Sequence, residues 1–170
     1  DETFASCDYL FLCAPVSTNV SFLNTIRKFI KPGTILTDVG STKGDIESAI
    51  EQAGLAQYFI GGHPMAGSER VGYEHSTAHL LENAYYILTP TRTVPVHCVE
   101  QFAEFVSSLG ALPLILDSRQ HDFATAAVSH LPHLIAVSLV NLVKDSDNEE
   151  HLLKTIAAGG FKDLTRIASS

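Results

Sequence analysis

Residues 9–40 read YLFLCAPVSTNVSFLNTIRKFIKPGTILTDVG, and this stretch decides the fold class. An apolar run at 9–13 predicts a short strand, and Ser17 is a candidate cap for the helix that follows. Pro32-Gly33 ends that helix, and residues 34–39 predict a second strand. The helix is expected to carry its apolar side chains on one face: Phe22, Leu23, Ile26, Phe29 and Ile30. A strand, a helix and a strand in this order are typical of a parallel sheet.

The same alternation continues to about residue 117. Thr42 and Asp45 resemble a capping box that would start the next helix, and Gly54 can close it. Further strands are predicted at 58–60, 85–88 and 112–116, and a further helix at 96–109. The buried positions expected in the two helices are Ile46, Ala49, Ile50 and Ala53, then Val99, Phe102, Val106 and Leu109. The pattern predicts a doubly wound α/β domain with a mostly parallel sheet covered on both faces.

The pattern changes near Asp117, where one long helix without strands is predicted at 118–143. Pro132 lies inside this helix and should bend it, because proline removes one backbone hydrogen bond. Its most apolar part, 134–143, is shorter than the roughly 20 residues of a membrane span, so a buried helix is expected. The chain is therefore divided into part of an α/β domain, 1–117, and the start of an all-helical domain, 118–170.

Composition excludes several classes of protein. The 170 residues carry a formal net charge of −8 without a cluster of Lys and Arg, which argues against a nucleic-acid partner. The three cysteines are an odd number without metal-type spacing, so reduced thiols in the cytoplasm are expected. His75 and His79 have the spacing of two metal ligands on a helix, but no third ligand is evident and no metal site is expected.

Ligands of such sheets bind at the carboxyl ends of the strands, so the segments just after the strands are the candidate sites. His63 follows one strand and precedes a proline, which suits a general base near pH 7, although a loop histidine is often structural. Gly40 would allow close backbone approach ahead of Ser41, where a helix start offers free N–H groups to a polar ligand. A plain strand–turn–helix connection is the other interpretation of that segment.

Polar residues also recur within the predicted long helix. Asp122, Ser129 and His133 lie at helical spacing and can line one side, while His130 points elsewhere and is the structural member of the pair. His133 is either a binding residue or a satisfied core histidine. Arg166 can hold a carboxylate in a bidentate fork, although an arginine taken alone is more often in a surface ion pair.

Taken together and in order, these segments resemble the prephenate/arogenate dehydrogenase family. The matching stretches are 14–16, 38–44, 63–69, 82–90, 121–122, 129–133 and 159–166. The resemblance implies a Rossmann-type domain and NAD(P)-dependent oxidative decarboxylation of prephenate to 4-hydroxyphenylpyruvate, a step of tyrosine biosynthesis. Arogenate, the amino analogue, would give tyrosine directly. It also implies a homodimer with a small-molecule substrate and no membrane partner.

The resemblance further implies a role for each candidate residue. His63 would be the catalytic base that takes the proton of the ring hydroxyl, and Ser41 would hydrogen-bond near that hydroxyl and the cofactor. His133 and Arg166 would bind the substrate, with Arg166 on a carboxylate. The cofactor would contact Ala14, Pro15, Val16, Gly40 and Ser41. Base, polar helix face and arginine are expected to converge on a crevice beside the sheet.

The sequence departs from the family pattern at both ends. Whole members begin with a strand, a Gly-x-Gly-x-x-Gly turn and a helix, and end with helices that build the dimer interface. Neither region is among these 170 residues. The 170-residue chain by itself is therefore expected to bind NAD weakly and to show little turnover. Its strand at 9–13 is expected to be an exposed apolar edge. Three alternatives stay open: arogenate dehydrogenase, with the same chemistry, a non-catalytic chain that only binds a ligand or partner, and, third, a metal-dependent hydrolase.

Overall fold

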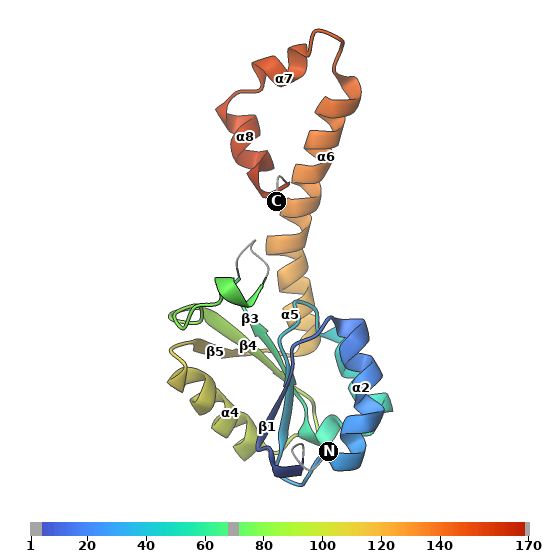
Figure 1. Cartoon of the computed structure of the whole chain (residues 1–170), viewed down its shortest axis with the longest axis vertical. Helices are drawn as coiled ribbons and strands as arrows, with labels where there is room; N and C mark the ends of the chain where they lie inside the picture. Colours follow the sequence, from blue (N-terminus) through green and yellow to red (C-terminus); the bar gives the residue numbers. More distant parts are fainter. Residues whose placement is uncertain (1–4, 68–71, 169–170) are drawn as a thin grey trace. The chain divides into compact units, whose positions relative to one another are not determined.

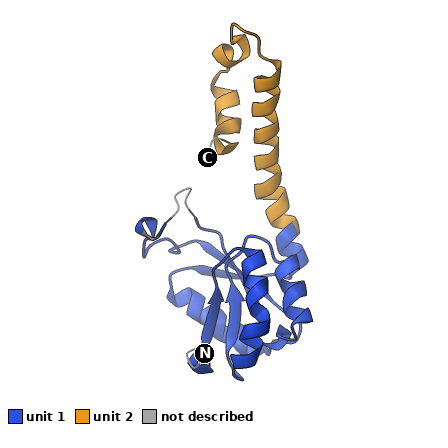
Figure 2. Cartoon of the chain, turned by 45° about the vertical axis from the view of Figure 1, so that its right-hand side comes forward, with its two compact units in different colours: residues 1–122 blue, residues 123–170 orange. Residues whose placement is uncertain are grey.

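The computed structural model describes residues 5–67 and 72–168, which belong to two compact units. The first unit, Asp1–Asp122, is α/β, and the second, Phe123–Ser170, contains only helices (Figures 1 and 2). The helix α5, Ser118–Thr125, contributes residues to both units. The domain boundary placed at residue 117 therefore stays a prediction.

The first strands of the α/β unit are parallel. Strand β1, Tyr9–Leu12, pairs in parallel with β2, Ile35–Asp38, and Leu12 is the partner of Asp38. A parallel bridge joins Leu36 to Phe59, just before β3, Ile60–Pro64. The predicted parallel arrangement of the first three strands is confirmed. The third strand, however, begins later than predicted, because 56–58 form the 3-10 turn η1, Ala56–Tyr58.

The rest of the sheet contains one antiparallel pair. Strand β4, Tyr85–Pro90, runs antiparallel to β3, and β5, Leu112–Ile115, runs parallel to β4. A parallel crossover needs a long connection, usually an α-helix, and the described residues between β3 and β4 contain only the 3-10 turn η2, Tyr73–His75. The doubly wound α/β class is confirmed, with a mixed sheet.

Two apolar clusters lie on opposite faces of the sheet. Helices α2, Val16–Phe29, and α3, Gly44–Gln52, cover one face, and α4, Val96–Ser108, covers the other (Figure 1). Successive residues of a strand point to opposite faces, so Ile35 joins one cluster and Leu36 the other. The helix faces were predicted correctly except at their margins, where Phe22 is 48% exposed and Leu109 is 41% exposed.

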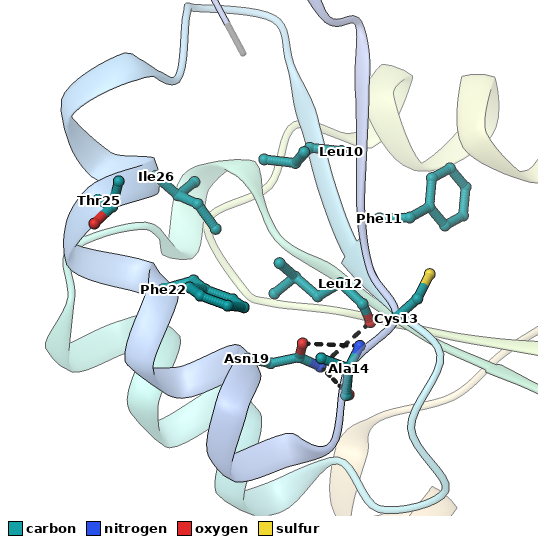
Figure 3. Close-up of a pocket in the computed structure, with 9 residues that line it drawn as sticks. All are labelled: Leu10, Phe11, Leu12, Cys13, Ala14, Asn19, Phe22, Thr25 and Ile26. Carbon is teal, nitrogen blue, oxygen red and sulfur yellow. Dashed lines mark hydrogen bonds between the residues drawn. The ribbon is translucent and has the colours of Figure 1, made fainter. Parts of the chain in front are cut away.

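The turn from β1 into α2 is held by a residue that sequence reasoning did not select. Helix α2 starts after Pro15 without a side-chain cap, so the predicted capping role of Ser17 is wrong. Instead the buried Asn19 accepts a hydrogen bond from the Ala14 N–H and donates to the carbonyl oxygens of Leu12 and Ala14 (Figure 3). Asn19 thereby fixes how the chain leaves the strand.

A pocket of about 350 Å³ lies beside this turn, between β1 and α2 (Figure 3). Its lining is mostly apolar: Leu10, Phe11, Leu12, Cys13, Ala14, Asn19, Phe22, Thr25 and Ile26. Within the described residues β1 pairs only with β2, and Tyr9, Leu10 and Phe11 are half-buried. Among the described residues one edge of β1 therefore has no strand partner, but the expected exposed apolar edge at 9–13 is only partly present, because Leu12 is buried and Tyr9, Leu10 and Phe11 are half-buried.

The helical unit begins on a modified helix. A π-helical turn, η3, Ala126–His130, follows α5 and leads into α6, Leu131–Ser146. Pro132 lies in the first turn of α6. Because proline has no N–H, it cannot donate the usual α-helical hydrogen bond to the preceding turn. That preceding turn is the wider π-helical one. The helices α7, Leu152–Ile156, and α8, Gly159–Thr165, follow, and the 3-10 turn η4, Arg166–Ala168, packs against α6.

The long helix is far more exposed than expected. Ala136 is the buried residue of α6, while Leu131, Leu134, Ile135 and Leu142 are exposed. The continuous helix Ser118–Ser146 also has the length and apolar composition of a membrane span, with 6% of its most apolar window buried. The expectation of a buried helix is wrong for the single chain, because its described residues supply too little surface to cover this helix.

The two glycines of β3 let the strand lie close to its neighbours. A Cβ atom at Gly62 would overlap the main-chain oxygen of Asp38 and lie 3.0 Å from Thr37 Oγ1. We predict that Gly62→Ala lowers the free energy of unfolding by about 1–3 kcal/mol, because the overlap forces backbone movement. Urea unfolding measures the change.

The matched control is Gly67→Ala, because a Cβ atom at Gly67 meets nothing within 4 Å. Its effect should stay within about 0.5 kcal/mol. Equal effects of the two substitutions would show that close strand approach at Gly62 does not limit stability.

Candidate active site

The carboxyl end of β2 is organised by one buried carboxylate, that of Asp38. Its Oδ1 accepts a hydrogen bond from the Gly62 N–H at 3.2 Å, and its Oδ2 accepts one from the Gly40 N–H at 2.9 Å. The Lys43 ammonium lies 2.5 Å from Oδ2 and also donates to the Gly62 carbonyl at 2.7 Å. Asp38 and Lys43 are both fully buried. This pair joins the end of β2, the loop carrying Ser41 and the strand carrying His63.

The ammonium of Lys43 stabilises the fold by pairing with Asp38 and does not serve as a binding group. Burial lowers the pKa of its ammonium, while the neighbouring Asp38 opposes that shift. The ammonium donates its hydrogen bonds to Asp38 and to the Gly62 carbonyl and is not accessible to solvent. It therefore cannot bind an anionic ligand at the surface. The sequence pattern around Ser41 gave no indication of this burial.

The start of α3 is capped from a distant part of the chain. The predicted capping box of Thr42 and Asp45 is wrong, because α3 has Lys43 at its N-cap and no side-chain cap hydrogen bond of its own. Instead Asp122 accepts hydrogen bonds from the Lys43 N–H at 2.8 Å and the Gly44 N–H at 2.9 Å. A carboxylate at this position satisfies two helix donors and complements the helix dipole.

A chain of hydrogen bonds connects that cap to His63. Nδ1 of His63 lies 2.8 Å from Nε2 of His121, and Nδ1 of His121 lies 2.8 Å from Oδ1 of Asp122. The two imidazole rings meet edge-on at 74°. His121 is fully buried and His63 is 9% exposed. The candidate base is thus held by a second histidine and a carboxylate.

Asp122 remains an anion at neutral pH. Partial burial acts to raise the pKa of its carboxyl group, but the Gly44 N–H, His121 and the Lys43 N–H outweigh burial and hold the pKa below its ordinary value. Asp117 and Gln120 form a reciprocal capping box at the start of α5, which places His121 and Asp122 on the first turns of that helix.

The predicted cofactor residues lie together at the same edge of the sheet. Because Leu12 and Asp38 are partners in the parallel pair, the segments that follow them leave the sheet side by side. A Cβ atom at Gly40 would lie 3.6 Å from Val16 and 2.9 Å from the Asp38 carboxylate. Ser41 and Pro15 are exposed, and Ala14 and Val16 are half-buried. The side chains of Ala14 and Ser41 are small and Gly40 has none, as a lining for a nicotinamide ring would require.

The other two predicted residues belong to the helical unit. His133 is exposed on α6 and lines a pocket of about 540 Å³ with His130, Leu131 and Leu134. The expectation that His130 points elsewhere is therefore wrong, since residues three positions apart are neighbours on one side of a helix. Arg166 is exposed at the start of η4.

The described residues place no group of three or more His, Cys, Asp or Glu side chains where they could hold a metal ion. Three residues that organise the site were given no role from the sequence: Asp38, Lys43 and His121. Asp122 was expected to line a polar helix side, and the structure shows that it also caps the start of α3. Asp38 could have been found from its position, because a carboxylate that ends an apolar strand needs a partner. The roles of Lys43, His121 and Asp122 depend on contacts between distant segments.

Two family models match the chain. The model described as the nucleotide-binding domain of prephenate dehydrogenase matches residues 1–113, and the one described as its dimerization domain matches residues 117–170. The prephenate dehydrogenase of Lactococcus lactis subsp. cremoris is 42% identical over 166 residues, which cover 96% of this chain and 45% of that protein.

Two solved structures are also similar. The prephenate dehydrogenase from Aquifex aeolicus, in complex with hydroxyphenyl propionate and NAD+, is 34% identical with a TM-score of 0.86, covering 96% of this chain and 57% of that one. The Synechocystis arogenate dehydrogenase is 28% identical with a TM-score of 0.88, covering 99% and 61%. This chain therefore spans about half the length of the relatives it matches.

The buried pair of Asp38 and Lys43 can be tested by removing one partner. We predict that Lys43→Met lowers the free energy of unfolding by about 3–5 kcal/mol, because it leaves the Asp38 charge buried without its counterion. Chemical denaturation measures the loss.

Lys31→Met is the matched control, because Lys31 forms an exposed ion pair with Asp8 at 3.0 Å. Its removal should cost less than about 1 kcal/mol. A similar loss for both lysines would contradict a special role for the buried pair.

Proposed function

The chain belongs to the prephenate dehydrogenase family, and from this premise we propose that the protein oxidises and decarboxylates prephenate to 4-hydroxyphenylpyruvate with NAD. One observation carries the proposal. A buried histidine, His63, lies near the carboxyl end of β3, and a second histidine and a carboxylate hold it. Ordered imidazoles at such a strand end suit proton abstraction next to a hydride acceptor.

His63 takes the proton of the ring hydroxyl in this proposal. NAD, when bound, would supply the hydride acceptor, so oxidation of the C–OH group to a ketone would give the hydride to the cofactor and the proton to His63. The ring carboxylate then leaves as carbon dioxide, and its bonding electrons make the ring aromatic. Ser41, exposed in the loop after β2, donates a hydrogen bond near the hydroxyl and keeps it oriented.

Residues of the helical unit bind the substrate. Prephenate carries two carboxylates, and the protein has a net charge of −8, so a local cation is required to hold this dianion. Arg166 supplies a guanidinium that can bind one carboxylate through two hydrogen bonds. His133 supplies an exposed imidazole in the pocket on α6.

Arogenate is the second candidate substrate. Its ring chemistry is the same, and the similar Synechocystis structure is an arogenate dehydrogenase. The two substrates differ only in the side chain, where arogenate has an ammonium in place of the keto group. Steady-state assays with both substrates measure the preference, and NAD and NADP are compared in the same assay.

We also propose the setting in which the protein works. Residues 1–117 belong to the cofactor-binding domain, and residues 118–170 begin the helical domain of a cytoplasmic homodimer. The match to a dimerization domain supports a partner subunit, rather than a membrane, as the cover for the exposed apolar residues of α6. The three cysteines form no disulfide within the described residues, as suits the cytoplasm.

The role of His63 is tested in the full-length protein. His63→Asn should lower kcat by roughly 10²–10⁴-fold with little change in KM, because the amide cannot accept the hydroxyl proton. His97→Asn is the control, since His97 is exposed on α4. Retention of most of the activity by His63→Asn would exclude His63 as the base.

The role of Arg166 is tested with Arg166→Gln, which keeps polarity and removes the charge. We predict a raised KM, equivalent to about 2–4 kcal/mol of lost charged contact, with a smaller effect on kcat. Lys162→Gln removes the same charge from the exposed surface of α8 and should leave KM unchanged. Equal KM values for the two variants would argue against a substrate carboxylate at Arg166.

A further inference from the structure

We propose that the carboxylate of Asp122 fills the anion position at the start of α3 and thereby acts as a positioning residue for the Ser41 loop, residues 39–42. The start of this helix is then closed to a phosphate group of the cofactor. The loop is left to contact uncharged groups through Ser41. The proposal rests on the proposed function only in placing Ser41 beside the substrate hydroxyl, because the ordering of the loop is a property of the α/β unit.

The start of α3 has the donors of an anion site. The first N–H groups of a helix have no partner within the helix and attract anions. Oδ1 of Asp122 accepts the Lys43 N–H at 2.8 Å, and Oδ2 accepts the Gly44 N–H at 2.9 Å. Two of the N–H groups that the sequence seemed to offer to a ligand are therefore already bound to a carboxylate of the same chain.

Charge and space both keep Asp122 in this position. Partial burial acts to raise the pKa of its carboxyl group, but hydrogen bonds from Gly44, His121 and Lys43 hold that pKa below its ordinary value, so Asp122 is an anion at neutral pH. A Cβ atom at Gly44 would lie 3.2 Å from Oδ2 of Asp122, so the absence of a side chain there lets the carboxylate approach. A phosphate at the same place would meet a like charge.

The other end of the Ser41 loop is held by Asp38. Its buried carboxylate accepts the Gly40 N–H at 2.9 Å. The loop is thus fixed by Asp38 where it leaves β2 and by Asp122 where α3 begins. Ser41 and Thr42 lie between these two attachments and are exposed. A loop this short with both ends fixed has few conformations, so the Ser41 hydroxyl is presented in a narrow range of positions.

Asp122 has a second contact that any experiment must separate from the first. Its Oδ1 also lies 2.8 Å from Nδ1 of His121, which contacts His63. A loss of activity on removal of Asp122 would therefore not show by itself which contact matters. The tests accordingly observe the two backbone N–H groups directly and ask whether the effect on catalysis passes through Ser41.

The first experiment measures amide hydrogen exchange at Lys43 and Gly44 in the full-length protein without cofactor. Open N–H groups at a helix start exchange rapidly, whereas groups bound to a carboxylate do not. We expect both amides to exchange about 10²-fold more slowly than in an unstructured peptide, and Asp122→Ala to remove at least about 10-fold of this protection. Rapid exchange of both amides in the unsubstituted protein would overturn the proposal.

The second experiment returns an anion to the empty position. Formate is small enough to enter the space left by the side chain in Asp122→Ala, and it should restore both the protection of the two amides and part of kcat. Chloride at the same ionic strength should not, and the unsubstituted protein should not respond to formate. Equal effects of formate and chloride, or no effect of either, would show that Asp122 does not act as a bound anion.

The third experiment is a double-mutant cycle. Asp122→Ala should lower kcat by about 10-fold or more, but by less than about 3-fold when Ser41→Ala is already present, because the hydroxyl that it positions is then gone. A loss only of fold stability would not produce this dependence on Ser41. The same loss of kcat in both backgrounds would assign the effect to the His121 contact and overturn the positioning role.

Asp45→Ala is the matched control, because Asp45 is an exposed carboxylate in the first turn of the same helix. It should change neither the exchange rates of Lys43 and Gly44 nor kcat. If Asp122→Ala does not fold, the exchange rates of the unsubstituted protein still decide whether the start of α3 is occupied. Absence of prephenate oxidation by the unsubstituted protein would count against the proposed function alone.

Discussion

The buried ion pair of Asp38 and Lys43 is the interaction on which the rest of the site depends. Asp38 stands where β2 ends, and its two oxygens accept from Gly40, Lys43 and Gly62, which belong to the loop, the helix start and the neighbouring strand. Burying a carboxylate lowers stability unless its oxygens accept hydrogen bonds. Loss of any one of these three contacts would therefore destabilise the buried Asp38 and, with it, the other two contacts. The Ser41 loop and the His63 strand are thus fixed at the same edge of the sheet.

A second carboxylate, that of Asp122 on α5, contacts the same loop and, through His121, the same strand. It binds the backbone just beyond Ser41 and, through His121, the ring of His63. The two carboxylates have different roles. Asp38 is neutralised by a lysine and keeps the strands in place, whereas Asp122 is stabilised by backbone donors and a histidine and, through that histidine, contacts the ring of His63.

The sequence was sufficient to predict elements that follow from local patterns. The strands β1 and β2 and the buried face of α4 were predicted because apolar runs and helical spacing are properties of neighbouring residues. The position of Ser41 after β2 followed from the same alternation, whereas His63, expected in a loop after its strand, lies inside β3, because that strand runs on to Pro64. The cap on α3 was predicted wrongly because its true partner, Asp122, lies 79 residues from Lys43. The exposure of α6 was missed because periodicity shows that a face is apolar, not what covers it.

The hydrogen bonds from His63 to His121 and from Lys43 to Asp122 join residues 58 and 79 positions apart. During synthesis the ribosome therefore releases the strand bearing His63 well before the helix that orients its ring. Until α5 has left the ribosome and docked, the His63 ring of the nascent chain lacks its His121 partner, and the start of α3 lacks its cap. The strands can therefore pair before the contacts that order His63 and the start of α3 have formed.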